Sequence, residues 1–139
     1  MSNHGQTCIA SDYVFVHESV SKEFLEQLIG GLKNDLPFLG RKVVSKNHYE
    51  RVCGLLANHG GEVVFGNGDA HKDMRLTPTV IVNPSKDSAL MKEEIFGPIL
   101  PVKIYKDLQE VVDYVNEREK PLVTYFFGEE EGEACKRLS

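Results

Sequence analysis

A cysteine near the start of the chain stands in a segment suited to covalent catalysis. The segment is Asn3-His4-Gly5-Gln6-Thr7-Cys8, of the form N-x-G-Q-x-C, and an apolar stretch over 13–16 follows it. Gly5 lets another molecule approach the backbone closely, and a thiolate can attack a carbonyl carbon. Backbone N–H groups at such a turn can hold the developing oxyanion. Cys8 is therefore the candidate nucleophile, with a buried core cysteine as the alternative.

The other residues of this segment and the other cysteines have plainer interpretations. His4 lies four residues from Cys8 and could act as its base. We favour the alternative, that His4 only fills the variable position x of N-x-G-Q-x-C. Asn3 is interpreted as a structural residue that holds the loop. Cys53 and Cys135 lie on predicted helix faces beside apolar residues, which is typical of core cysteines.

A second candidate constellation is the acidic run Glu93-Glu94-Ile95-Phe96-Gly97-Pro98. A carboxylate can accept hydrogen bonds from both hydroxyls of a ribose, which would set the position of a nucleotide cofactor. Gly97-Pro98 would hold such a loop in one shape. The alternative is an exposed acidic helix end that runs into a strand.

Taken in this order, the two motifs resemble the active-site cysteine segment and the cofactor-ribose segment of NAD(P)-dependent aldehyde dehydrogenases. The resemblance implies that Cys8 is the catalytic nucleophile, that Glu94 binds the nicotinamide ribose and that Phe96 packs near the nicotinamide. The implied reaction converts an aldehyde, a small-molecule substrate, to a carboxylic acid through a thiohemiacetal and a thioester, with hydride transfer to NAD or NADP.

Further stretches are similar to the class 3 branch of this family, which acts on fatty and aromatic aldehydes. They are Cys8-Ile9-Ala10-Ser11-Asp12-Tyr13 and Arg118-Glu119-Lys120-Pro121-Leu122. His48 falls where the family has a cofactor-side residue at the start of a helix, with an exposed helical histidine as the alternative. The resemblance also implies that the parent enzyme is a homodimer or a higher homo-oligomer.

The resemblance covers nearly the whole chain but only about a third of a full-length family member. We expect residues 1–139 to be a partial catalytic domain, without the nucleotide-binding domain and the water-activating glutamate. The chain has no G-x-G-x-x-G that opens a helix. The fragment alone is therefore predicted to be inactive, or nearly so, as a dehydrogenase.

Two rival functions stay open from the sequence. An acylating aldehyde reductase of the same fold would pass the thioester to an acceptor other than water. A non-catalytic interaction or structural module would keep the fold after losing the rest of the enzyme. The product made by a full-length version would distinguish the acylating reductase from the dehydrogenase. The reactivity of Cys8 would distinguish the non-catalytic module from an enzyme.

Composition narrows the class of protein. The 139 residues carry a net charge of −5 without a basic stripe, which disfavours nucleic-acid binding. The three cysteines are widely spaced, which disfavours a disulfide framework and a metal site and indicates a reducing, cytoplasmic location. The chain shows no signal-peptide core or membrane-length apolar run, and a membrane-anchoring C-terminal tail in the parent stays open.

The elements that must position these residues alternate between strands and helices. This alternation predicts an α/β fold with a largely parallel sheet flanked by helices, of the aldehyde dehydrogenase catalytic-domain type but incomplete. Pro101 is expected at an edge, a bulge or the start of its strand. Strands are predicted over 12–17, 63–65, 79–82, 99–105 and 122–127, and helices over 19–34, 47–58, 88–92, from Asp107 and over 129–138. Ser19 or Ser21 can cap the first of these helices, whose buried face is predicted to be Val20, Phe24, Leu25, Leu28, Ile29 and Leu32. Asp107-x-x-Glu110 has the shape of a capping box, and the inner face of its helix is predicted to be Leu108, Val111, Val112 and Val115.

Overall fold

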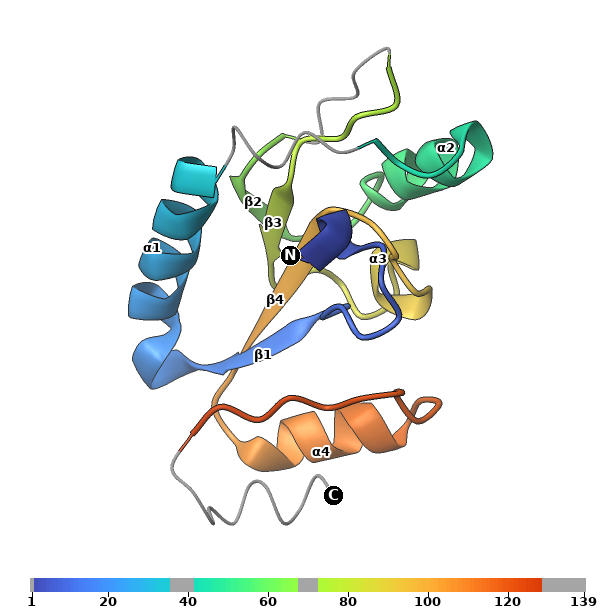
Figure 1. The fold of residues 1–139 in the computed structure, drawn as a ribbon. Coiled ribbons are helices and arrows are strands. Elements are labelled where there is room, and N and C mark those ends of the chain that lie inside the picture. Colours follow the sequence, from blue (N-terminus) through green and yellow to red (C-terminus); the bar gives the residue numbers. More distant parts are fainter. Residues whose placement is uncertain (1, 36–41, 68–72, 129–139) are drawn as a thin grey trace. The chain divides into compact units, whose positions relative to one another are not determined.

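The computed structural model describes residues 2–35, 42–67 and 73–128. A short turn, η1 (Ser2–Gly5), comes first, and four strands and four helices follow it (Figure 1). They are, in chain order, β1 (Val14–His17), α1 (Glu18–Asp35), α2 (Lys46–Leu55), β2 (Glu62–Phe65), β3 (Thr79–Val82), α3 (Ala89–Lys92), β4 (Ile99–Tyr105) and α4 (Leu108–Asn116). The predicted elements over 12–105 are confirmed with shifts of a few residues at their ends.

The four strands form one sheet in the order β1-β4-β3-β2. β3 and β4 are parallel, with Thr79 opposite Ile99, and β2 runs antiparallel to β3 at one edge. All four residues of β3 and the first four of β4 are buried, as expected for strands covered on both faces. The predicted α/β class is thus confirmed.

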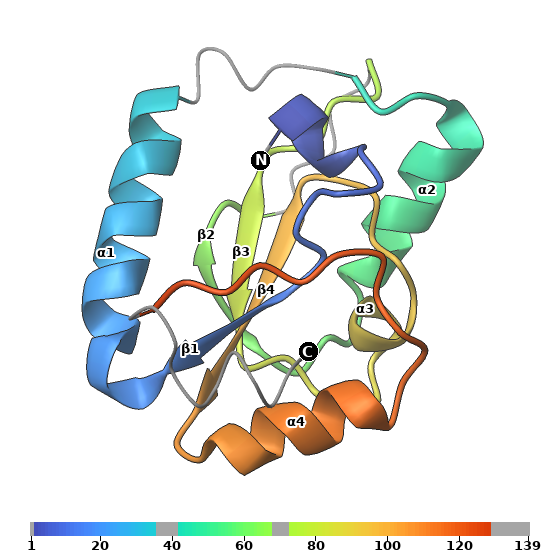
Figure 2. The ribbon, with the colours of Figure 1, turned by 60° about the horizontal axis from the view of Figure 1, so that its bottom comes forward.

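Helices cover the two faces of the sheet in the unit formed by residues 1–104 (Figure 2). Because side chains alternate along a strand, Val80 and Val82 face one side while Ile81 faces the other. The first side packs against α1 through Phe24, Leu25, Leu28 and Leu32. The second side packs against α2 and α3 through Val52, Leu55 and Leu90.

Pro101 contradicts the expectation of an edge, a bulge or a strand start. It lies inside β4, which has neighbours on both sides, and it stands opposite Ile81. The bonds that flank this pair run from Thr79 N to Pro98 O and from Asn83 N to Val102 O. Along a strand, the main-chain groups of successive residues point alternately to its two sides. The backbone nitrogen of Pro101 therefore faces away from β3, and the hydrogen bonds between β3 and β4 do not need the missing N–H of Pro101.

Helix ends and faces bring smaller corrections. Helix α1 begins at Glu18, and Ser19 N donates to Nδ1 of the preceding His17, so the predicted serine caps are wrong. Val20, predicted on the buried face, is exposed because it lies a turn before Phe24, where contact with the core begins. In α2, Val52 and Leu55 are buried, while Tyr49, Cys53 and Leu56 are half-buried around them.

Helix α4 belongs to a second compact unit, over 105–139. The predicted capping box is confirmed: the Asp107 side chain accepts from Gln109 N, and Glu110 accepts from Asp107 N. Val111 and Tyr114 are the buried residues of α4, so the predicted inner face is only partly right. The strand predicted over 122–127 is absent, because no described strand pairs with it, and the predicted helix over 129–138 lies outside the described residues.

Candidate active site

The Cys8 segment is a tight, left-handed loop. Asn3, His4 and Gly5 have φ values of 46°, 62° and 75°, a conformation that only glycine adopts without cost. Asn3 Nδ2 donates to Gln6 O at 3.0 Å, which confirms the structural role predicted for Asn3. Ala10 N then donates to Thr7 O at 2.8 Å, so Cys8 lies inside a turn. Cys8 is a free cysteine and is exposed rather than packed in a core.

Gln6 fastens this loop to the segment before α2. Its side-chain Nε2 donates to Lys42 O at 3.2 Å, and its Oε1 accepts from Val44 N at 2.9 Å. The side-chain amide therefore bonds as a neighbouring strand would, using both its donor and its acceptor. His4 is buried, with 2% of its surface exposed.

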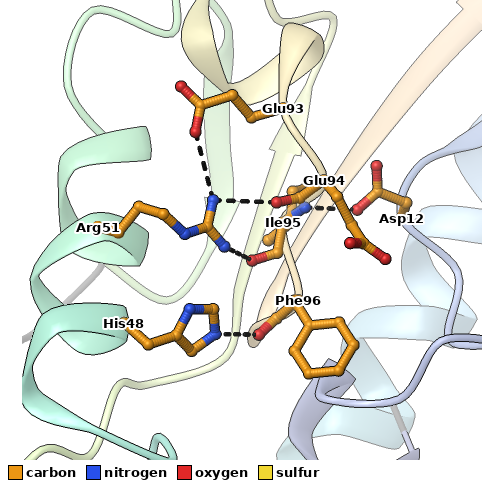
Figure 3. A network of polar contacts seen from close by, with 7 residues as sticks. All are labelled: Asp12, His48, Arg51, Glu93, Glu94, Ile95 and Phe96. Carbon is orange, nitrogen blue, oxygen red and sulfur yellow. Dashed lines mark hydrogen bonds and ion pairs between the residues drawn. The ribbon is translucent and has the colours of Figure 1, made fainter.

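The loop over 93–98 is held by one face of α2, drawn in Figure 3. Arg51 Nη1 donates to Glu94 O at 3.0 Å, and Arg51 Nη2 donates to Ile95 O at 2.6 Å. His48 Nε2, three residues earlier, lies 2.7 Å from Phe96 O. Residues three apart share a helix face, so two side chains of α2 hold three successive carbonyls.

Asp12 holds the same loop from the other side. Its carboxylate accepts from Ile95 N at 2.8 Å. Burial, the largest cause, raises the pKa of Asp12; the hydrogen bond from Ile95 lowers it, the Glu94 charge raises it and the Arg51 charge lowers it. Asp12 lies four residues after Cys8, so this bond links the thiol segment to the acidic loop.

The two motifs also meet directly at two glycines. A Cβ on Gly5 would clash with the carbonyl oxygen of Gly97. A Cβ on Gly97 would lie 2.9 Å from the side chain of Val52 in α2. Gly5 is therefore needed for the close approach of two backbones, and Gly97 for the close approach of its loop to the side chain of Val52. The contact of Gly5 with Gly97 brings together segments that are far apart in the sequence.

The structure places the predicted site residues as follows. Cys8 and Glu94 are exposed, and Phe96 and His48 are half-buried with their rings edge to face at 6.0 Å. His48 binds a loop carbonyl, and its predicted contact with a cofactor stays a prediction. Sequence reasoning missed the contacts of Arg51 and Asp12. The available signals were the three-residue spacing of Arg51 from His48 and the presence of Asp12 in the run that follows Cys8.

Comparison with known proteins agrees with this arrangement. The chain matches the aldehyde dehydrogenase family profile over residues 1–138. It is similar to a structure described as the substrate-bound state of Staphylococcus aureus AldH, at 36% identity and a TM-score of 0.84, covering 98% of this chain and 31% of that one. Sequence relatives include the 4,4'-diaponeurosporen-aldehyde dehydrogenase of Staphylococcus aureus, 39% identical over 94% of this chain and 30% of the relative.

The dimeric NADP-preferring aldehyde dehydrogenase of Canis lupus familiaris is 33% identical over 90% of this chain and 28% of the relative. The chain thus spans roughly three tenths of the length of these relatives, in agreement with the fraction expected from the motifs. A family match over nearly every residue, together with a thiol loop and an acidic loop in direct contact, shows that this chain belongs to the aldehyde dehydrogenase family.

Proposed function

We propose that this chain supplies the cysteine-bearing part of an enzyme that oxidises an aldehyde to a carboxylic acid with NAD or NADP. The observation that supports this most is the contact of the Cys8 segment with the Glu94 loop through Gly5 and Gly97. Hydride transfer needs the carbon attached to the thiol and the acceptor ring in one place, so the nucleophile and a cofactor anchor must be neighbours.

Cys8 has the position that a nucleophile needs. Its exposed sulfur, as the thiolate, attacks the aldehyde carbon and forms a carbon–sulfur bond, and the carbonyl oxygen becomes an oxyanion that main-chain N–H groups of the turn can stabilise. Loss of hydride from this thiohemiacetal leaves a thioester on Cys8. Water then cleaves the thioester, which releases the acid and restores the thiol.

The residues present fit the nicotinamide-ribose end of a dinucleotide. The Glu94 carboxylate is exposed on a loop whose main chain is fixed, and a carboxylate can accept from both ribose hydroxyls. The Phe96 ring is half-buried beside it and offers an apolar surface. When bound, the cofactor supplies a hydride acceptor. The preference stated in the name of the dog relative supports NADP as one candidate.

A chimera tests the role of Cys8. Residues 1–139 replace the matching 31% of Staphylococcus aureus AldH, and NADH or NADPH formation from an aldehyde is followed by absorbance. We expect activity from the chimera and a loss of at least about a thousandfold in Cys8→Ser, because a hydroxyl is a far weaker nucleophile. Cys53→Ser, a half-buried cysteine of α2, is the matched control and should keep activity. Full activity in a folded Cys8→Ser chimera would refute the proposal.

The reaction product and the isolated chain give two further checks. Release of free acid by the chimera supports the dehydrogenase, whereas an acyl thioester or acyl phosphate would favour the acylating reductase.

The purified 139-residue chain should form no NADH or NADPH from aldehydes. Clear turnover by it would contradict the prediction that the fragment alone is inactive. Within that chain, iodoacetamide should label Cys8 about tenfold faster than Cys53, because Cys8 is the more exposed thiol.

No helix among the described residues has both the length and the apolarity to span a membrane. We propose a cytoplasmic location on the spacing of the cysteines, and an oligomeric parent enzyme on the family resemblance.

A further inference from the structure

One peptide group of the acidic loop is held at both of its ends. The carbonyl of Glu94 accepts from Arg51 at 3.0 Å, and the N–H of Ile95, in the same peptide plane, donates to Asp12 at 2.8 Å. A peptide group is planar, so fixing both ends fixes its orientation. In Figure 3 this peptide group bridges Arg51 of α2 and Asp12 of the thiol segment.

The next carbonyls of the loop are held in the same way. In an extended chain, successive carbonyls point to opposite sides, yet those of Glu94, Ile95 and Phe96 are all bound from α2. Phe96 has φ of +49°, a left-handed conformation that turns its carbonyl relative to that of Ile95 and costs a residue with a Cβ about 1–2 kcal/mol. Hydrogen bonds from a charged donor such as Arg51 can offset such a cost.

The guanidinium of Arg51 binds main chain rather than the Glu94 carboxylate. Figure 3 shows that carboxylate on the far side of the loop from Arg51, toward Asp12. Arg51 does contact the carboxylate of Glu93, at 3.4 Å, and both side chains are partly exposed. Such an exposed ion pair contributes little to stability, so the two hydrogen bonds to carbonyls are the main interactions of the Arg51 guanidinium.

We propose that Arg51, His48 and Asp12 are positioning residues that set the direction of the Glu94 carboxylate and the Phe96 ring by holding the main chain between them. This inference rests on the proposed function, in which those two side chains meet the nicotinamide riboside. It assigns to His48 a role through Phe96 O rather than through the cofactor. It also makes α2 the element that connects the core to the cofactor end of the site.

The first test uses the 139-residue chain and needs no activity. Amide hydrogen exchange is followed by NMR in wild type, Arg51→Lys and Arg51→Met. We expect the Ile95 amide, which donates to Asp12, to exchange at least about tenfold faster in both variants, because a lysine cannot bond two carbonyls as a planar fork does. Amides of β3 should be unchanged, which shows that the fold survives. Unchanged exchange at Ile95 in both variants would overturn the proposal.

Two controls separate the carbonyl bonds from charge alone. Lys46 is also a cation of α2 and pairs with Glu50 at 3.7 Å, at an exposed position. Lys46→Met should therefore leave the loop unchanged. Glu93→Gln removes the ion-pair partner of Arg51 and keeps both carbonyl acceptors, so it should change loop exchange by less than about twofold. A Glu93→Gln effect as large as that of Arg51→Met would assign the loop order to the ion pair and overturn the proposal.

His48 offers a spectroscopic signature. A carbonyl oxygen only accepts, so Nε2 of His48 must carry the proton. Side-chain nitrogen shifts should show a protonated Nε2 in wild type. His48→Gln, which keeps a donor, should retain slow exchange in the loop, whereas His48→Leu should lose it. A neutral His48 protonated at Nδ1 alone would contradict the assigned bond and the proposal with it.

The second test reads function in the chimera described above. Arg51→Lys should raise the KM for NAD(P) or lower kcat by at least about tenfold, while iodoacetamide labelling of Cys8 stays within about twofold. Lys46→Met should match the parent chimera. Normal kinetics in Arg51→Lys, with a disturbed loop, would reduce Arg51 to a purely structural residue and overturn the proposal. An inactive but folded parent chimera would refute the proposed function, and the exchange and nitrogen-shift results would still decide whether the loop is held.

Discussion

The loop over 93–98 and the segment over 122–127 reverse what their sequences suggest. The first contains two adjacent carboxylates, yet side chains of other segments bind three successive carbonyls and one N–H of its main chain. The second contains strand-forming apolar residues, yet it has no regular structure, and Leu122 and Phe127 are 77% and 89% exposed. Order here follows the supply of partners, not the hydrophobicity of the segment itself.

The physical reason is that backbone groups need partners at fixed places. Arg51 lies on α2 and Asp12 lies just before β1, and both α2 and β1 contribute residues to the core, so these side chains meet the acidic loop without further ordering. A single strand buries little surface and leaves its main chain unpaired unless another strand adjoins it. Removal of a side chain that binds the loop over 93–98 should therefore disturb that loop strongly. Substitutions in the segment over 122–127 should have hardly any effect.

The largest effect is expected where the two motifs touch. Gly5→Ala puts a methyl group against Gly97 O and into a left-handed conformation, so we expect a loss of about 3 kcal/mol in the free energy of unfolding, measured with urea. Gly30→Ala is the matched control, because Gly30 lies in α1 with open space around it. It should be neutral or stabilise by up to about 1 kcal/mol. Equal effects of the two substitutions would show that the close contact of Gly5 with Gly97 does not cause the loss of stability.

A helix cap tests the unit over 105–139 at a smaller scale. Asp107→Ala removes the acceptor for Gln109 N and the partner of the capping box, so α4 should lose about 1 kcal/mol. Amide exchange in the first turn of α4 measures this. Asp107→Asn keeps an acceptor and should restore most of the loss; if it behaved like alanine, the cap would not be the cause.

The pH dependence of Asp12 sharpens the account of the acidic loop. Its pKa is raised above the ordinary value of 3.8 in the folded chain, mainly by burial. Its contribution to stability is therefore fully present below that value and is lost as the pH rises through the folded-state pKa. Wild type should lose stability relative to Asp12→Asn as the pH rises from below 3.8 through the raised pKa of Asp12, measured by urea unfolding. A trend in the opposite direction would mean that its hydrogen bond and Arg51 outweigh burial.

The smallest effect is expected in the apolar segment. Phe127→Ala should change the free energy of unfolding by less than about 0.5 kcal/mol, because its ring is exposed in this chain. Leu90→Ala, in the core against α2, should cost about 2–5 kcal/mol and serves as the reference. A loss of more than about 2 kcal/mol for Phe127→Ala would show that the segment is packed, and the contrast between the two regions would fail.

Sequence alone carried the local features of this chain. The periodicity of α1 and the capping box at Asp107 depend on neighbours within a few residues, and both predictions are confirmed apart from the cap and Val20 of α1. The strands β3 and β4 could also be predicted, because an unbroken apolar run has few other uses. The identities of Cys8 and Glu94 as candidate site residues came from short motifs, which a sequence displays directly.

Tertiary structure decided which of these pieces meet and what holds them. The contact of Gly5 with Gly97 joins segments that no local rule connects. Arg51 binds main-chain carbonyls, which every residue has, so the sequence gives no sign of which ones it binds. The place of Pro101 inside a strand with two neighbours was likewise decided by the tertiary structure, since the nitrogen points away from β3 only in this register. Backbone hydrogen bonds are chemically uniform, so only the fold determines which of them a side chain can reach.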